Sequence, residues 1–273
     1  MSLSILNNIS SLEANNALNM TQANLNSTLE QLSTGSRINN GADDPAGLAI
    51  ANGLQANVTA LTQSVQNASD GVGELQVADG ALAQVTALLN QAVSVATEAA
   101  TGTVSNAQRT SLDNEFQSIT AEITSIGAAT TYNGAAVFGS GTLTIFMSDS
   151  SGVGTTTITA DVAALSATSL TLNADSLTTA AKAQTALTDI NNAIAAVAAQ
   201  RGNLGASSNQ LQAATNVMNA QITNLQNAES GIMDADMGTT TANLSKYSIL
   251  QQTGIAALQQ SNAMQQSILK LLQ

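Results

Sequence analysis

Residues 187–232 read LTDINNAIAAVAAQRGNLGASSNQLQAATNVMNAQITNLQNAESGI, and this stretch decides the fold. One column of residues recurs at every seventh position without a polar interruption: Ile190, Val197, Leu204, Leu211, Met218, Leu225 and Ile232. A second column, three residues earlier, contains Leu187, Ile194 and Ile222. The alternating spacing of three and four residues places an apolar stripe along one side of a helix. The stretch therefore predicts a long helix that packs lengthwise against a partner.

A matching apolar stripe runs through the first half of the chain, from Leu54 to Leu75 and again from Ala78 to Ala99. The step of three from Leu75 to Ala78 indicates a local slip in winding, not a helix end. Because the two stripes are far apart in sequence and equally long, we expect the two helices to pack along each other as a rod. The predicted fold class is mainly α, with long coiled-coil helices.

The remaining elements follow from caps and periodicity. Asp44 can cap a helix whose first residue is Pro45, the one position where the missing N–H of proline costs nothing. Alternating apolar residues from Leu143 to Met147 and a β-branched run ending at Thr159 predict one small β-hairpin at about 140–160, with a turn near 149–152. The first expected helix lies within 3–33, begins loosely among residues 7–11, and is stopped by Gly35 and the run 39–41. The other expected helices cover about 45–100, 105–128, 180–232 and 240–271.

The composition excludes several classes of function. The chain has 273 residues, of which only 9% are charged, and a formal net charge of -12. With six Lys and Arg residues, binding to nucleic acid or attraction to an anionic membrane is not expected. No His or Cys is present, so common zinc sites and Ser-His or Cys-His nucleophiles are excluded. We predict no catalytic residue, no metal and no cofactor, and recognise neither a signal peptide nor a membrane span.

The two chain ends have little to bury in isolation. Ordering residues 1–40 and 234–273 costs at least ~1 kcal/mol per residue in backbone conformational entropy. Each large apolar side chain stabilises the fold by ~2 kcal/mol, and only when it is fully buried. A lone pair of helices covers one face of each. We therefore predict that both ends are disordered or frayed in the isolated chain, and that they fold when other copies of the chain cover their remaining faces.

The segment LSTGSRINNGADDPAGLAI at residues 32–50 resembles the signature of bacterial flagellin. Further resemblances follow in the order of that family at residues 66–71, 79–82, 132–134, 201–206, 234–236 and 268–272. The short chain is similar to the two-domain, Caulobacter-like flagellins of alphaproteobacteria. The resemblance implies that residues 1–42 and 234–273 are the two halves of an inner-tube domain of antiparallel helices. Residues 43–233 would then be the rod domain with its β-hairpin, without outer domains.

The resemblance also implies a function and a set of partners. The chain would be a structural subunit of the bacterial flagellar filament, secreted and self-assembling as a homopolymer with copies of itself or sister flagellins into the extracellular propeller used for swimming. Its other partners would be the flagellar type III export apparatus, an export chaperone, the filament cap and the hook-junction proteins. No nucleic acid or inserted membrane is among them. Because Asn90 and Gln91 stand where many flagellins have an arginine-bearing helix face, recognition by an innate immune receptor is expected to be weak or missing.

In the family view, eight apolar residues pack in the inner tube, and an export chaperone could cover the C-terminal ones before secretion. They are Leu18, Leu25, Leu32, Leu250, Ile255, Leu258, Ile268 and Leu272. A second group is expected to make contacts between layers or subunits: Arg37, Asp43, Asp44 and Arg201. For Arg37 the alternative is a local ion pair with the two nearby aspartates. For Arg201 the alternatives are a side chain that extends along the surface and an inter-subunit salt bridge.

The hairpin resembles the element that lets filaments change supercoil, although it can equally be simple cover for the helices. Its hydroxyl residues are candidates for O-glycosylation, with β-propensity as the alternative explanation: Ser148, Ser150, Ser151 and Thr155. Three other functions stay open. They are a hook–filament junction protein, a secreted coiled-coil effector or binding protein, and a carboxylate-based hydrolase, which would need two acids converging in one cleft.

Overall fold

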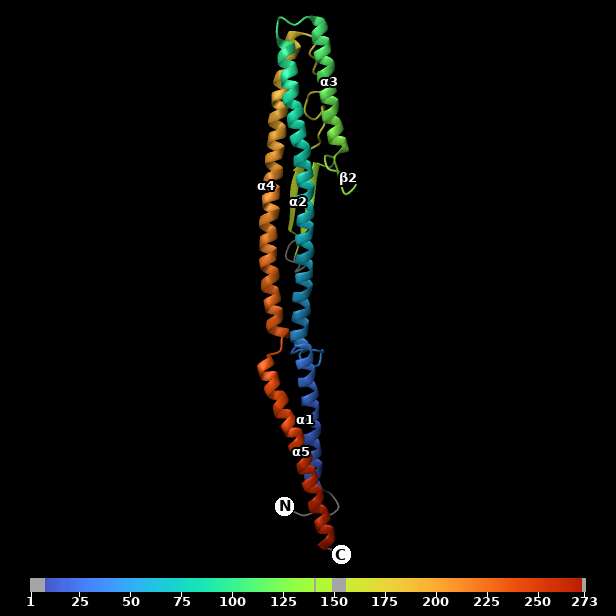
Figure 1. The fold of residues 1–273 in the computed structure, drawn as a ribbon, viewed down its shortest axis with the longest axis vertical. Coiled ribbons are helices and arrows are strands. Elements are labelled where there is room, and N and C mark those ends of the chain that lie inside the picture. The colour runs from blue at the N-terminus through green and yellow to red at the C-terminus, as the bar shows by residue number, and fades with distance from the viewer. Residues whose placement is uncertain (1–7, 140, 149–155, 272–273) are drawn as a thin grey trace. The chain divides into compact units, whose positions relative to one another are not determined.

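A computed structural model describes residues 8–139, 141–148 and 156–271, with Thr156 and residues 268–271 described by their backbone alone. The helices are α1 (Ile9–Thr34), α2 (Pro45–Ala100), α3 (Asn106–Ala129), α4 (Ala180–Met233) and α5 (Met237–Leu271). The strands are β1 (Thr131–Tyr132), β2 (Ala135–Ala136), β3 (Gly141–Met147) and β4 (Thr156–Val162) (Figure 1). The mainly α-helical class predicted from the sequence is confirmed.

The chain divides into two compact units. The terminal unit consists of residues 1–56 and 224–273, and the central unit consists of residues 57–223. Among the described helices, none is long and apolar enough to cross a membrane. The helix bounds lie within a few residues of those predicted from periodicity and caps. Asp44 caps α2 as expected, because its Oδ1 accepts a hydrogen bond from the backbone N–H of Gly47 at 2.9 Å.

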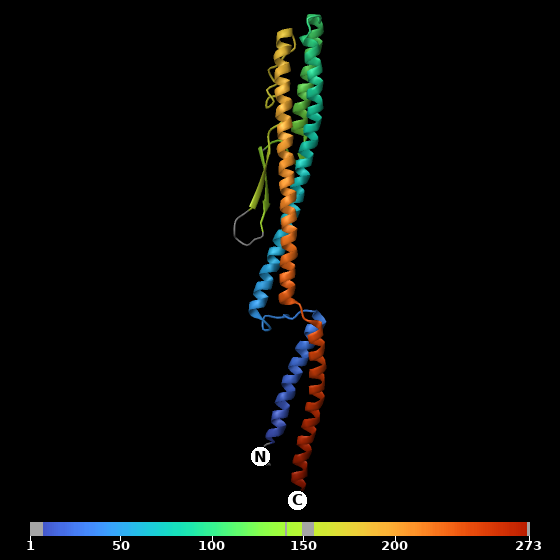
Figure 2. The ribbon, with the colours of Figure 1, turned by 90° about the vertical axis from the view of Figure 1, so that its left-hand side faces the viewer.

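The core of the central unit lies where α2 and α4 run side by side (Figures 1 and 2). Five of the seven residues in the α4 column are buried: Ile190, Val197, Leu204, Leu211 and Met218. Leu225 and Ile232, at the end of the column, are only half-buried. On α2, Leu75 and Ala78 are both buried in one continuous helix, so the step of three between them does not end the helix.

Helix α3 closes the central unit beside α2 (Figure 1). Its first turn is a capping box between Ser105 and Gln108, and its apolar face buries Phe116 and Ile123 completely. The side chain of Arg109 is buried at the same end. Its Nε donates to the carbonyl oxygen of Ala99 at 2.9 Å, and its Nη2 donates to that of Thr101 at 2.8 Å. One guanidinium thus satisfies carbonyl groups where α2 ends.

We expect Arg109→Lys to lower the free energy of unfolding of the central unit by about 1–3 kcal/mol, because a single ammonium cannot reproduce the two-pronged geometry and leaves a buried carbonyl unsatisfied. Urea unfolding followed by circular dichroism measures this loss. The control is Lys182→Ala, an exposed position on α4, where the change should stay within about 0.5 kcal/mol. Equal effects of the two substitutions would contradict the capping role.

The predicted hairpin is confirmed as β3 paired antiparallel with β4, with Ile145 opposite Ile158. It lies against α2, where the Oγ of Ser64 donates to the carbonyl oxygen of Ser148 at 3.0 Å. Ile145 fills the space above Gly71, and a Cβ added there would lie 2.2 Å from the Ile145 Cδ1 atom. The expected turn at 149–152 lies outside the described residues.

Residues 163–179 connect β4 to α4 and bury four leucines without forming a helix or strand: Leu165, Leu170, Leu172 and Leu177. The backbone N–H of Ala167 donates to the Oγ1 of Thr124 at 3.1 Å, and that of Leu177 donates to the Oδ1 of Asp113 at 2.6 Å. This connecting segment is therefore fixed to α3 by hydrogen bonds as well as by its leucines. Periodicity did not predict it.

The terminal unit pairs α1 with α5, which lie side by side in both views (Figures 1 and 2). Helix α1 ends at the glycine predicted to stop it, since Gly35 adopts a left-handed conformation with φ of 75°. Both ends are helical over their described residues. The prediction that the ends are disordered or frayed in a single chain therefore does not hold for these residues, because α1 and α5 already pair with each other. That other copies cover their remaining faces stays a prediction.

Candidate assembly interface

The two segments in which the chain leaves a helix, after α1 and after α4, are hydrogen-bonded to each other. Ser36, after α1, forms an isolated antiparallel β-bridge with Asp234, after α4. The N–H of Arg37 donates to the carbonyl oxygen of Met233 at 2.6 Å, and that of Ala235 donates to the oxygen of Gly35 at 2.9 Å. Backbone hydrogen bonds therefore hold the end of α1 against the end of α4. We call residues 35–44 and 234–236 the junction.

Arg37 contributes a side-chain bond to this junction. Its Nη2 donates to the carbonyl oxygen of Ile232 at 2.8 Å, in the last turn of α4. No ion pair joins Arg37 to Asp43 or Asp44 in the described part of the chain. The alternative of a local ion pair is therefore wrong, because both carboxylates already accept backbone N–H groups. Asp43 accepts those of Asn39 and Asn40, each at 3.0 Å, and Asp44 caps α2.

Asp236 was not singled out as a site residue, yet it caps α5. Its Oδ1 accepts the N–H of Gly238 at 2.9 Å, and its Oδ2 accepts the hydroxyl of Thr239 at 2.7 Å. The Thr239 hydroxyl, followed by the two backbone N–H groups, lowers the pKa of the Asp236 carboxyl below its ordinary value. The signal was present in the sequence, since an aspartate directly before a helix is a preferred N-cap.

Contacts between α1 and α5 are partly apolar and partly amide-mediated. Leu25 is buried, whereas Leu18, Leu32 and Leu258 are half-buried. The Nε2 of Gln251 donates to the Oε1 of Gln22 at 2.6 Å. A shallow groove of about 300 Å³ lies on this pair and is lined by Ala17, Leu18, Thr21, Leu250, Thr253, Gly254 and Ala257.

Much of the apolar surface of α1 and α5 has no partner within the chain. Leu250 and Ile255, two of the predicted inner-tube residues, are each 43% exposed. Other large apolar residues of these two helices are exposed as well: Ile9, Leu12, Met20, Leu29, Ile249 and Met264. The side chain of Ile268 and the whole of Leu272 lie outside the described residues. Large apolar side chains left exposed on both helices indicate an interaction site.

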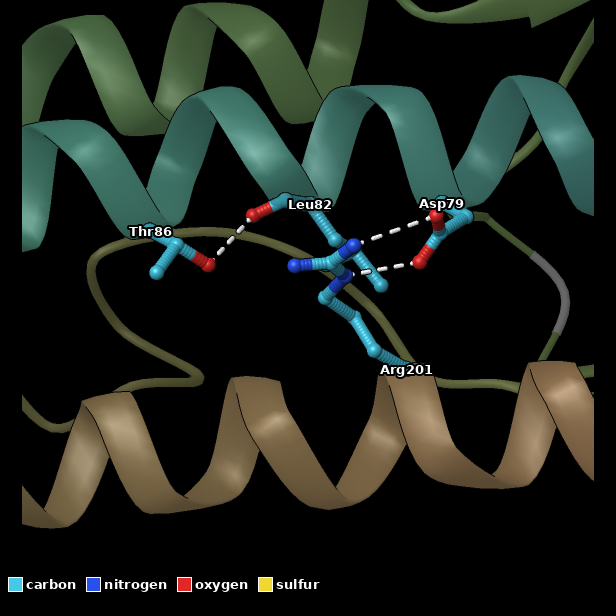
Figure 3. Close-up of polar contacts among 4 residues, drawn as sticks. All are labelled: Asp79, Leu82, Thr86 and Arg201. Carbon is cyan, nitrogen blue, oxygen red and sulfur yellow. Dashed lines mark hydrogen bonds and ion pairs between the residues drawn. The ribbon is translucent and has the colours of Figure 1, made fainter.

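Within the chain, Arg201 makes a contact that neither alternative named. It forms an ion pair within the chain, with its Nε 2.7 Å from the Oδ1 of Asp79 and its Nη2 3.2 Å from the Oδ2 (Figure 3). The carboxylate raises the pKa of Arg201 above its ordinary value. The pair links α4 to α2 beside a groove of about 490 Å³. Since both side chains are substantially exposed, the pair contributes little to stability and is screened by salt.

The glycosylation candidates gain no support from the geometry. The backbone of Ser148 is held by Ser64, and Ser150, Ser151 and Thr155 lie outside the described residues. Asn90 and Gln91 are exposed on α2, and the Nε2 of Gln91 donates to Glu115 at 3.2 Å. Among the described residues, no group of three or more acidic, His or Cys side chains could hold a metal ion.

Comparison with known proteins finds relatives at both ends of the chain. The family model described as the bacterial flagellin N-terminal helical region matches residues 5–142, and the model of the bacterial flagellin C-terminal helical region matches residues 187–272. Flagellin 1 of Proteus mirabilis is 39% identical over 116 residues, which cover 42% of this chain and 32% of the relative. B-type flagellin of Pseudomonas aeruginosa is 34% identical over 124 residues, which cover 45% of this chain and 25% of the relative.

The chain therefore spans about a third or less of the length of these curated relatives. Among solved structures, a flagellar hook-associated protein from Vibrio parahaemolyticus aligns with a TM-score of 0.56 and 15% identity. The alignment covers 70% of this chain and all of that one. At this identity the likeness shows a shared fold.

Proposed function

The chain belongs to the bacterial flagellin family, and we propose that it is a structural subunit of a flagellar filament that assembles through its terminal unit. Flagellins are structural proteins, in keeping with the proposal that the chain is not an enzyme. One observation carries the proposal. The chain pairs its two ends as α1 and α5, yet leaves large apolar side chains on both helices uncovered.

Further copies of the chain are the proposed cover for this surface. Burying a Leu, Ile or Met side chain stabilises by about 1.5–3 kcal/mol. Several such contacts per subunit are needed to exceed the roughly 4–15 kcal/mol that association costs in lost freedom of motion, and α1 and α5 expose enough such residues to supply them. Apart from Glu13 and Glu30 on α1 and two lysines on α5, the two helices carry no charged side chains, so little like-charge repulsion opposes contact between copies. A heterologous contact of this type, repeated without closing, produces a helical filament.

Several finer statements belong to the same proposal. Residues 1–42 and 234–273 form the inner tube, and 43–233 form the rod domain around it. The chain leaves the cell through the type III export apparatus, is accompanied by a chaperone that covers α5, and meets the cap and the hook-junction proteins outside. The alphaproteobacterial subtype and the weak recognition by innate receptors also stand as proposals, supported by the short sequence and by the side chains at positions 90 and 91.

The test replaces three exposed residues of α5 with serine, in the variant Ile249→Ser, Ile255→Ser, Met264→Ser. Full-length chain is seeded with filament fragments in ammonium sulfate, which favours apolar burial, and is examined by electron microscopy and sedimentation. Loss of three buried side chains removes on the order of 4 kcal/mol or more per subunit, which raises the critical concentration for assembly roughly a thousandfold. We therefore expect long filaments from the parent chain and none from the variant.

The matched control keeps these positions apolar, as Ile249→Val, Ile255→Val, Met264→Leu, and should still form filaments. Circular dichroism verifies that both variants are as helical as the parent. Filaments from the serine variant would overturn the role of this surface. Finite particles from every chain, the parent included, would instead favour a junction protein or a secreted effector, and a low number of copies per flagellum would distinguish the first of these.

A further inference from the structure

The connecting segment 163–179 contains a carboxylate oxygen that is buried without a hydrogen-bond partner. Among the described residues, the Oδ2 atom of Asp175 is the buried side-chain atom left unsatisfied. Asp189, on α4, lies near enough to the Asp175 carboxyl that, after burial, its charge and a side-chain hydrogen bond to it raise the pKa of that group. Two ionised carboxylates in this position would repel each other, and a buried acceptor without a donor is destabilising. A single proton between them removes both penalties.

The surroundings of Asp175 offer no cation in its place. Helix α3 contributes Gln117, whose Nε2 donates to the main-chain oxygen of Asp175 at 2.9 Å. It also contributes Asp113, a further acid, which accepts the N–H of Leu177. Helix α4 contributes Asp189, and its Lys182 is exposed to solvent. In the described part of the chain, no ion pair involves Asp175. The group that can satisfy the buried oxygen is therefore a shared proton.

We propose that Asp175 and Asp189 share one proton taken from solvent, and that this carboxyl–carboxylate pair fastens the connecting segment to α4 in acid and loosens it as the pH rises. In the protonated state, one carboxyl O–H donates to an oxygen of the other group. Gln117 and Asp113 hold the same stretch of backbone to α3. The pair thus adjusts how tightly the segment is held without unfolding the central unit.

The sign of the pH dependence follows from burial. Burial, followed by the charge of Asp189 and the hydrogen bond to it, raises the pKa of the folded Asp175 carboxyl above its ordinary value. A raised pKa means that the closed segment binds the proton more tightly than the opened one. The stabilisation is fully present below the ordinary pKa of aspartate, about 3.9, and is lost as the pH rises through the folded pKa.

Hydrogen exchange of the full-length chain tests the proposal, with the backbone amide of Leu172, which donates to the carbonyl oxygen of Ala167 at 2.9 Å, as the local reporter. Protection is measured from about pH 7 to about pH 3, a range that includes the ordinary pKa of aspartate, and is corrected for the intrinsic pH dependence of exchange. In the parent chain, protection should increase as the pH falls, by up to tenfold per pH unit for a single linked proton. In Asp175→Asn the side-chain amide donates in place of the proton, so protection should be independent of pH.

Asp189→Asn is the second variant and should remove the pH dependence in the same way, from the α4 side. The matched control is Asp161→Asn, an exposed aspartate on β4, which should keep the pH dependence of the parent. The shared proton is supported if protection against exchange is independent of pH in either variant and still depends on pH in the Asp161→Asn control. Slopes equal to that of the parent in both variants would overturn it. Neither result depends on whether the chain forms filaments.

Discussion

Leu211→Ala is expected to lower the free energy of unfolding of the central unit by about 2–5 kcal/mol. Leu211 lies in the middle of the seven-residue column of α4 and has no exposed surface. Its Cδ1 lies close to Gly71 of α2, at a point where the hairpin residue Ile145 also contacts that helix. Truncation would leave a cavity bordered by two helices that pack along each other, which restricts how far either can collapse into it.

Thermal unfolding by calorimetry measures this effect, because in a unit of this size each kcal/mol lowers the Tm by about 2–4 °C. The matched control is Val217→Ala, six residues further along the same helix, where the side chain is 58% exposed. That substitution should change the Tm by little, since an exposed valine gives up almost no buried area. If the two variants melt together, the α4 column is not the core that its burial indicates.

Gly127→Ala is expected to destabilise the central unit by about 1–3 kcal/mol, although alanine is normally the better helix former. A Cβ at position 127 in α3 would lie 1.9 Å from the carbonyl oxygen of Leu165 and 2.9 Å from its carbonyl carbon. These are backbone atoms of the connecting segment, which cannot rotate away as the end of a side chain would. Either α3 or the segment must shift, and the hydrogen bond from Ala167 to Thr124 would lengthen.

Gly202→Ala is the control for this substitution, because an added Cβ on that helical glycine meets nothing within 4 Å. There the usual preference applies, and alanine should stabilise by about 0.5–1 kcal/mol. Urea unfolding of the two variants should therefore give changes of opposite sign. A stabilising Gly127→Ala would show that the connecting segment does not press against α3 as the structure has it.

Local sequence patterns predicted the elements well because helices and hairpins are determined by near neighbours. The seven-residue column identified α4, Asp44 with Pro45 located the start of α2, and the alternation from Leu143 to Met147 identified β3. The connecting segment could not be predicted in this way. Its four buried leucines are irregularly spaced, and its path is fixed by contacts with α3 that no local pattern encodes.

In the candidate site, too, the features set by local sequence were predicted and the contacts between distant residues were not. Leu25 was expected to pack and is buried, whereas the partners of the charged residues were not identified. Arg37 bonds to a carbonyl 195 positions away, and Arg201 pairs with an aspartate 122 positions away. Such partners depend on which helix faces lie opposite each other. The exposure of Leu250 and Ile255, in contrast, agrees with the expectation that a lone pair of terminal helices leaves one face of each helix uncovered.

The pairing of α1 with α5 also determines when the terminal unit can fold. Gln22 and Gln251 are 229 positions apart, and Asn8 and Gln265 are 257 positions apart. Contacts at such sequence separation form late, because the loop that joins them must close first. A chain emerging from its N-terminus therefore carries α1 without its partner until nearly the last residue is free. The terminal unit therefore forms only when the C-terminal residues become available, after all residues of the central unit.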